Sequence, residues 1–162
     1  MGAFAAWHDF FIAQVGASAA LAGLLFVALS INIERILKFP WLPARAVTTL
    51  SLLLGALIEA SIALWPRESL RVVGLELLVV GVVVWMLVLH QTFWGPKTPA
   101  DYRSGAAISA IVSQLTTLSA VGGALVVVFG APAGIYAIAA GMLLAIVGGF
   151  YNSWVLLVEI LR

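Results

Sequence analysis

The sequence contains five long apolar runs, at approximately residues 10–33, 44–65, 70–94, 105–129 and 133–161. Each has about 18 residues or more, the length that an α-helix needs to cross roughly 30 Å of hydrocarbon. Only 9% of the 162 residues are charged and 64% are hydrophobic, whereas a soluble domain carries about 25% charged residues. We therefore predict an all-α integral membrane bundle of five transmembrane helices, forming a single domain over residues 1–162.

Proline and glycine residues separate these runs. Four prolines stand where a helix could begin, a position at which the missing N–H is tolerated: Pro43, Pro66, Pro99 and Pro132. Gly130 indicates a helix end just before the last run. Thr98 and Asp101 have the spacing of a capping box, which predicts the start of the fourth helix.

The basic residues predict the orientation of the bundle. Six Lys and Arg residues fall on one side and two, Arg67 and Arg71, on the other. The side with more Lys and Arg normally faces the cytoplasm, so we expect the N-terminus outside and the C-terminus inside a cell (plasma) membrane. The start of the chain has no Lys or Arg before the first run and no cleavage site, which favours a retained span over a signal peptide.

Several function classes have no support in the sequence. The chain has no cysteine, hence no disulfide framework, thiolate metal site or cysteine nucleophile. Its net charge of +1 gives no reason to expect a nucleic-acid partner. No nucleophile elbow, phosphate loop, dinucleotide fingerprint or HExxH motif is present, so we predict no enzyme and no cofactor. The two histidines, His8 and His90, are expected near opposite surfaces, so no shared metal site is predicted.

Small residues recur on one face of the first, fourth and fifth runs, and the stripe of the fourth consists of Ser109, Ser113, Thr116, Ala120 and Gly123. The fifth run carries Gly134, Gly141 and Gly148 on one stripe, and the first carries Gly16 and Gly23. Small side chains let membrane helices approach closely, so the stripes are interpreted either as packing seams or as the lining of a water-filled path. Five thin helices also favour a homo-oligomer, with the first span as the expected subunit contact.

Two acids, Glu59 and Glu76, flank the turn at Pro66 within apolar runs. Both are equally far from the turn, so in a helical hairpin they are expected at one level, roughly 10 Å below the outer surface. Acids in membrane spans usually face the protein interior or an aqueous cavity. They are interpreted as a cation or proton site, or else as structural groups that bond Ser and Thr neighbours or pair with Arg67 and Arg71. A lipid-facing position is the third alternative.

Further polar residues are expected near each end of the bundle. The first span brings Asp9, Gln14 and Ser18 toward the level of the two acids, which adds them to the predicted ion pathway. A second polar group is predicted at the cytoplasmic ends of the helices, either solvated or acting in gating and ion exit: Asn32, Glu34, His90, Asn152 and Glu159.

The segment Gly16 to Leu37, GASAALAGLLFVALSINIERIL, is similar to segments of small uncharacterised bacterial multi-pass membrane proteins. Its part from Ser18 to Glu34 also resembles the pore-lining first helix of Orai-type calcium channels. Gly23 and Val27 match that family's glycine and hydrophobic constriction residue. The family's selectivity glutamate would fall at Ile31, and its subunits have four spans with the N-terminus inside. The resemblance implies an ion pore lined by the first span.

Together these features predict a homo-oligomeric ion channel or channel-like permease, favouring a small cation, in the cell membrane of a bacterium. The expected partners are membrane lipid, further copies of the chain and a small inorganic ion. The alternative is a non-transporting accessory subunit that binds a partner protein or lipid through its small-residue helix faces.

Overall fold

The structure is a computed structural model that describes residues 4–66, 69–96 and 103–161, with side chains described up to residue 155 in the last helix and from residue 105 in the one before it. Five long helices cover most of this range: α1 (His8–Ile31), α3 (Trp41–Ala63), α4 (Leu70–Trp94), α5 (Arg103–Val128) and α6 (Gly134–Leu161). Two short elements accompany them, the 3₁₀ turn η1 (Ala5–Trp7) and α2 (Ile33–Ile36). The predicted all-α fold of five long apolar helices is confirmed, and the chain is a multi-pass membrane protein.

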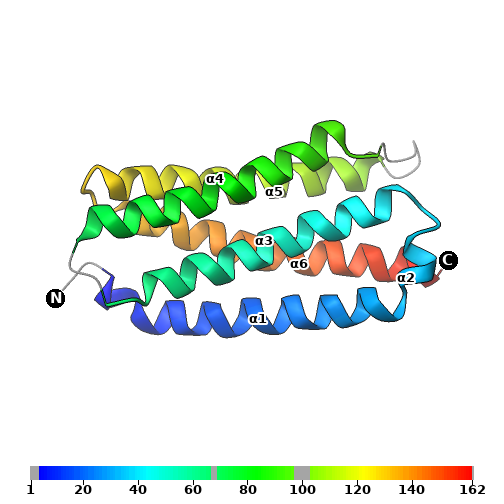
Figure 1. The fold of residues 1–162 in the computed structure, drawn as a ribbon, viewed down its shortest axis with the longest axis horizontal. Helices are drawn as coiled ribbons and strands as arrows, with labels where there is room; N and C mark the ends of the chain where they lie inside the picture. The colour runs from blue at the N-terminus through cyan, green and yellow to red at the C-terminus, as the bar shows by residue number, and fades with distance from the viewer. Residues whose placement is uncertain (1–3, 67–68, 97–102, 162) are drawn as a thin grey trace.

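The five long helices run alternately up and down along one axis (Figure 1). The end that carries the N-terminus, the α3–α4 turn and the α5–α6 turn is called here the Pro66 end. The opposite end, with α2 and the C-terminus, is called the Pro40 end. Helices α3, α4, α5 and α6 form a ring in which each packs against the next, while α1 lies outside it against α3 and α6. Helices α3 and α5 are thus diagonal partners across the middle of the ring.

Local sequence explains where the helices begin and end. Helix α3 begins at Trp41, earlier than expected, with Pro43 inside its first turn, where a proline breaks no helical hydrogen bond. Gly130 has a φ of 88°, and Ala131 N–H donates to the Val126 carbonyl at 3.1 Å. These are features of a Schellman ending, which confirms the predicted stop. The Thr98–Asp101 capping box lies outside the described residues.

Glycines set the close contact between α5 and α6. A Cβ on Gly123 would lie 2.6 Å from the Gly134 carbonyl oxygen, and one on Gly141 would lie 2.9 Å from that of Thr116. A Cβ on Gly148 would come within 3.0 Å of Val112. Glycine at these positions therefore allows near contact of the two backbones.

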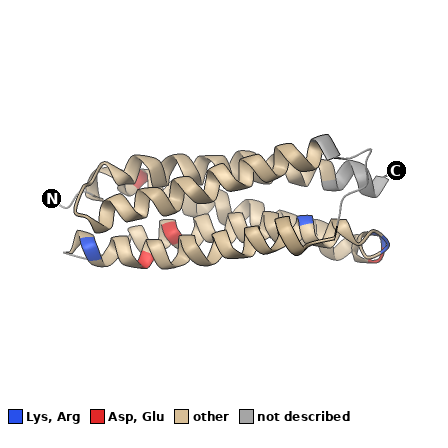
Figure 2. Cartoon of the chain, turned by 90° about the horizontal axis from the view of Figure 1, so that it is seen from above, with Lys and Arg blue, Asp and Glu red and all other residues tan. Residues whose placement is uncertain are grey.

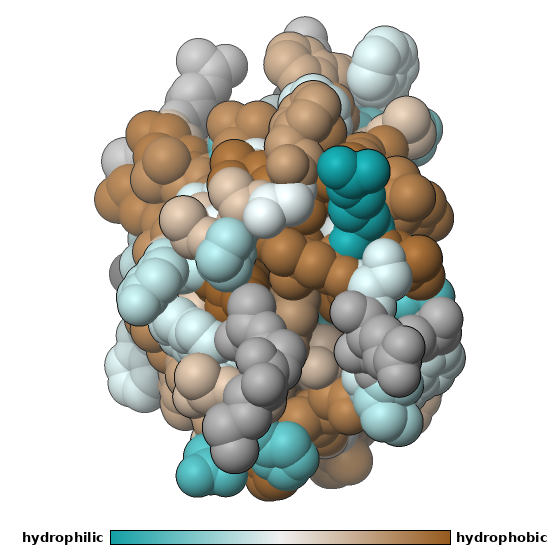
Figure 3. All heavy atoms as spheres, turned by 90° about the vertical axis from the view of Figure 1, so that its left-hand side faces the viewer, coloured by the Kyte–Doolittle hydropathy of each residue, from teal (hydrophilic) through white to brown (hydrophobic). Residues whose placement is uncertain are grey.

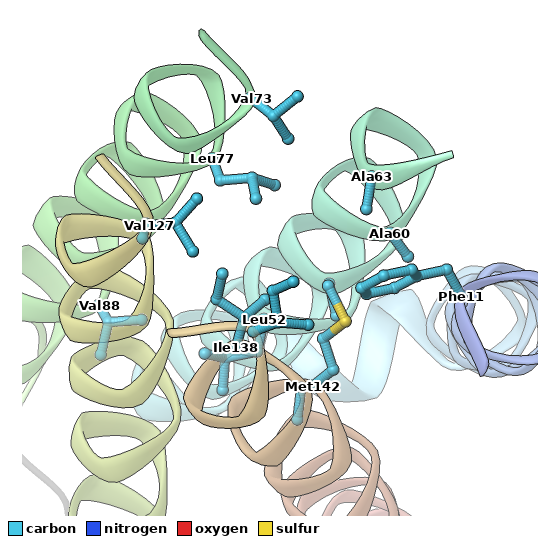
Figure 4. Close-up of a cluster of buried hydrophobic side chains, with 14 residues drawn as sticks. Phe11, Leu52, Ala60, Ala63, Val73, Leu77, Val88, Val127, Ile138 and Met142 are labelled. Carbon is cyan, nitrogen blue, oxygen red and sulfur yellow. The ribbon is translucent and has the colours of Figure 1, made fainter. Parts of the chain in front are cut away.

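The interior at the Pro66 end is apolar. Phe11 of α1 packs beside Ala60 and Ala63 of α3, and Leu77 of α4 faces Val127 of α5 (Figure 4). Figure 3 shows this end from outside, with hydrophilic residues scattered among hydrophobic ones. Most of the acidic segments lie in the half of the bundle that carries the Pro66 end, with another on α2 at the Pro40 end, whereas Lys and Arg lie toward both ends (Figure 2). Hydrophobic side chains therefore fill the interior near this end, while its surface is mixed.

Candidate functional site: a carboxyl group in the four-helix ring

Glu59 lies inside the ring because of its place on the buried stripe of α3. The stripe follows the helical period through Leu52, Ala56, Ala60 and Ala63, all of which are buried. Glu59 belongs to the same stripe and is 5% exposed. Its side chain makes no hydrogen bond or ion pair with any part of the chain that the structure describes. An acid is thus held in the protein interior without a partner from these residues.

The Glu59 carboxyl group borders a small cavity in the middle of the ring, here called the Glu59 cavity. Its volume is about 20 Å³, and a cavity of roughly 10–15 Å³ is enough for one water molecule. All four ring helices line it: Leu52, Gly55, Ala56 and Glu59 from α3; Gly81 and Val84 from α4; Thr116, Thr117 and Ala120 from α5; and Gly141, Met142 and Ala145 from α6. One small guest could therefore contact the acid and all four helices.

The two threonines of this lining use their hydroxyl hydrogens along α5 itself. Thr116 Oγ1 donates its hydrogen to the Val112 carbonyl at 2.8 Å, and Thr117 Oγ1 donates to the Ser113 carbonyl at 3.0 Å. A hydroxyl has a single hydrogen to donate and two lone pairs. With the hydrogens used along α5, the hydroxyls can serve the cavity as acceptors. Together, the carboxyl group of Glu59 and the two threonine hydroxyl oxygens could bind a cation, because hard cations take oxygen ligands. The carboxyl group could also carry a proton.

Glu76 is not in the lining of this cavity, although its Oε2 atom is buried, as expected for an acid that points inward. Glu76 is half-buried on α4, whereas Glu59 Oε1 lies beside Gly81, five residues further along that helix. Side chains lean toward the N-terminus of their own helix. Since α3 and α4 are antiparallel, the two acids lean in opposite directions along the axis. The two acids therefore do not line one cavity.

The α1 residues assigned to the ion pathway lie away from the Glu59 cavity. Gln14 Nε2 donates to Ser18 Oγ at 3.1 Å and to the Met142 carbonyl at 3.2 Å, and both side chains are buried. Gln14 thus ties α1 to Met142 of α6, which lines the Glu59 cavity, whereas Gln14 and Ser18 do not. Asp9 is fully exposed beside His8. Gly16 and Gly23 stand on a face of α1 where an added Cβ would meet nothing within 4 Å.

A larger cleft opens at the Pro40 end, here called the Arg45 cleft. Its volume is about 400 Å³. Its lining comes from α3, from the end of α4 and from the start of α5: Trp41, Ala44, Arg45, Thr48, Gln91, Thr92, Phe93, Gly95, Pro96, Ala106, Ser109, Ala110 and Ser113. The polar side chains of this lining contrast with the apolar Pro66 end.

Only one turn of helix separates the cleft from the Glu59 cavity. On α3 the cleft reaches Thr48 and the cavity reaches Leu52, four residues on; on α5 the cleft reaches Ser113 and the cavity reaches Thr116, three residues on. Four residues span about 6 Å of helix. In the other direction the interior is filled by the core that includes Ala60, Leu77 and Val127. The shorter and more polar route to Glu59 therefore begins at the Pro40 end.

The predicted second polar group is not one cluster. Asn152 is fully buried and accepts hydrogen bonds from Arg45 and Ser109. His90 is exposed and stacks on Trp94 at a centroid distance of 6.0 Å. Asn32 donates to the Ala28 carbonyl, and Glu34 is exposed on α2. Glu159 lies in the last turn of α6, where side chains are not described.

Comparison with known proteins adds no relative: no family model, curated protein or solved structure matches the chain. Among the described residues there is also no group of three His, Asp or Glu side chains that could hold a metal ion. The chemistry of the site thus has to be inferred from Glu59 and its surroundings.

Two contributors to this region were missed from the sequence. The second helix was expected to begin at residue 44, which left Arg45 at its edge as one of the basic residues that set the orientation, but Arg45 lies in the second turn of α3. The tolerance of a first-turn proline could have placed it correctly. Thr117 was not assigned to any stripe, although it follows Ser113 by one helical turn.

Proposed function

We propose that the protein is a channel-like permease for a small monovalent cation or a proton, with Glu59 as the site in the pathway. One observation carries this proposal: a buried carboxyl group borders a cavity of about 20 Å³ that all four ring helices line. An acid in a membrane span costs about 2.5–3.5 kcal/mol in insertion at the helix centre and is typical of ion and proton pathways. Among the described residues, Glu59 makes no hydrogen bond or ion pair that would offset this cost.

Charge and size favour a monovalent guest. Glu59 is the sole ionisable residue in the lining of its cavity. One carboxylate balances one positive charge, whereas a divalent ion would leave a net charge in an apolar interior, which is costly. A cavity of about 20 Å³ admits a dehydrated ion, a hydronium ion or a single water, and excludes a larger substrate.

The proposed orientation of the protein in the membrane, and the membrane it occupies, are inferred from the sequence. The Pro40 end carries the majority of the Lys and Arg residues, so we place it in the cytoplasm and the protein in the cell membrane. The Arg45 cleft then faces the cytoplasm, and the apolar core at the Pro66 end closes the outer side.

Flux measurements in liposomes test this function. Purified protein is reconstituted, and uptake of ²²Na⁺ and acidification of the lumen are followed for the wild type, Glu59→Gln and Glu76→Gln. We expect flux above protein-free liposomes that is lost in Glu59→Gln and retained in Glu76→Gln. Glu34→Gln, a change in an exposed acid on α2, is the matched control for removal of a carboxylate. Flux that is equal in the wild type and Glu59→Gln would exclude Glu59 from the pathway.

One observation supports a second candidate function, an accessory subunit. The α1 face with Gly16 and Gly23 is open to contact, because nothing lies within 4 Å of an added Cβ at either position. Small residues on an open face of a membrane helix favour close approach of another helix. The same face could hold further copies of the chain in a homo-oligomeric permease, or a different membrane protein.

A further inference from the structure

A column of hydroxyl groups on α5 connects the Arg45 cleft with the Glu59 cavity. Ser109 and Ser113 belong to the lining of the cleft, and Thr116 and Thr117 belong to that of the cavity. These four residues are called here the α5 hydroxyl column, and the last three of them are buried. Members one turn apart are separated by about 6 Å along the helix, a gap that one water molecule can bridge through two hydrogen bonds.

The hydroxyls of the column keep the capacity to bond water. Ser113 Oγ donates to the Ser109 carbonyl at 2.8 Å, and Thr117 Oγ1 donates to the Ser113 carbonyl at 3.0 Å. These bonds use the one hydrogen of each group and leave two lone pairs. Because a hydroxyl also rotates to suit its partners, it can accept a hydrogen from one water and donate its own to the next. The column can therefore continue a chain of hydrogen bonds from the cleft inward.

The Glu59 carboxyl group lies at the inner end of the column. It borders the same cavity as Thr116 and Thr117, and this cavity of about 20 Å³ has room for one water molecule. The acid is buried and makes no hydrogen bond or ion pair within the described residues. A water molecule in the cavity is therefore shared between the threonine hydroxyls and an acid that has no other partner in this part of the chain.

The cavity offers fewer oxygens than a metal ion takes. Its lining has four side-chain oxygens, two from Glu59 and one each from Thr116 and Thr117, whereas hard metal cations such as Mg²⁺ and Ca²⁺ take six or more oxygen ligands. The backbone carbonyls of the lining lie within helices, where they accept main-chain hydrogen bonds. A cavity for one water also leaves no space for a hydrated ion. A proton binds one carboxylate oxygen and leaves a neutral group, which costs less to bury than a charge.

We propose that the ion taken up by Glu59 is the proton, and that it moves between the Arg45 cleft and Glu59 along the α5 hydroxyl column. A hydronium ion in the cavity transfers its proton to a Glu59 carboxylate oxygen, which leaves a water molecule and a neutral carboxyl group. The reverse transfer returns the proton to the water, which Thr117 positions. This inference rests on the proposed function and narrows its substrate from a small cation to the proton.

Parallel flux measurements in liposomes test the choice of ion. A potassium gradient with valinomycin sets a membrane potential that is negative inside, and a pH-sensitive dye in the lumen reports proton entry while ²²Na⁺ uptake is counted. We expect acidification that depends on Glu59 and no ²²Na⁺ uptake above that of protein-free liposomes. Uptake of ²²Na⁺ that is lost in Glu59→Gln would overturn the proton assignment and leave the permease in place. Absence of Glu59-dependent flux of either ion would overturn both.

A variant of Thr117 tests the route. Thr117→Val removes the hydroxyl at nearly constant volume, and we expect proton flux to fall by about tenfold, as loss of one hydrogen bond does, whereas Thr117→Ser should retain it. Thr49→Val is the matched control, because Thr49 is buried on α3 and donates to a carbonyl one turn back, but lines neither the cleft nor the cavity. Its proton flux should equal that of the wild type, while both valine variants should unfold at similar temperatures.

Ser113→Ala tests the outer part of the column independently of Thr117. This variant should also slow proton flux, so the route remains testable if Thr117→Val fails to fold. Proton flux at the wild-type level in Ser113→Ala, or an equal loss of flux in Thr117→Val and Thr49→Val, would overturn the route.

Discussion

Glu59 Oε1 lies directly against Gly81 of the neighbouring helix, so that a Cβ placed on Gly81 would come within 3.4 Å of the carboxyl oxygen and 3.2 Å of Val121 Cγ2. The absent side chain of Gly81 thus leaves space beside the acid. Gly81 is one of the residues that line the Glu59 cavity.

Gly81→Ala should therefore impair the proposed cation site. A methyl group would occupy much of a cavity of about 20 Å³, and we expect ion flux in liposomes to fall by about tenfold, a change worth roughly 1.4 kcal/mol. Gly122→Ala is the control, because an added Cβ there meets nothing within 4 Å. Unchanged flux in Gly81→Ala would show that ions do not pass through this cavity.

The α5–α6 contact predicts opposite outcomes for two adjacent glycines. Gly123→Ala would place a Cβ 2.6 Å from the Gly134 carbonyl oxygen, and overpacking of this kind costs about 1–3 kcal/mol. Gly122→Ala meets no neighbour and should be neutral or stabilise by about 0.5–1 kcal/mol. Thermal unfolding in detergent measures both. Equal unfolding temperatures for the two variants would contradict the close approach of these helices.

The route to Glu59 can be mapped with single cysteines, since the chain has none of its own. A membrane-impermeant maleimide should modify Thr48→Cys and Ser113→Cys from the Pro40 side only. Thr117→Cys, one turn deeper, should react more slowly, and Ala60→Cys in the apolar core should not react. Vesicles of known orientation then identify the cytoplasmic side. Modification of Ser113→Cys from the Pro66 side would reverse the proposed direction of access.

The open face of α1 predicts the oligomeric state. Gly16→Leu combined with Gly23→Leu adds bulk where no residue of the same chain lies within 4 Å, so the fold should persist while contacts with other helices weaken. Light scattering of the detergent-solubilised protein should show a smaller assembly for the double variant. Gly122→Leu, on an exposed face of α5, is the control. Identical masses for all three proteins would exclude this face as the subunit contact.

The helices could be predicted well from the sequence. The length of an apolar run, and the effect of a glycine or proline on where a helix ends, are both local properties. The stop of α5 just before Gly130 depends on that glycine and its neighbours, so it could be predicted. The relation of Glu59 to Glu76 could not, because it depends on the opposite lean of side chains in antiparallel helices and on the register that sets Glu59 beside Gly81. The Arg45–Asn152 contact joins residues that are 107 positions apart, and no local pattern indicates it.

Carbodiimide modification of Glu59 tests the central claim most directly. Dicyclohexylcarbodiimide is apolar and reacts with protonated carboxyl groups, so an acid that exchanges a proton for a cation is modified more slowly when that cation is present. Mass spectrometry of the protein should find the adduct on Glu59, slowed by increasing Na⁺ or by rising pH, and absent from Glu59→Gln. Modification that occurs on Glu76 instead, or at the same rate under all these conditions, would contradict the assignment of Glu59 as a site of cation or proton exchange.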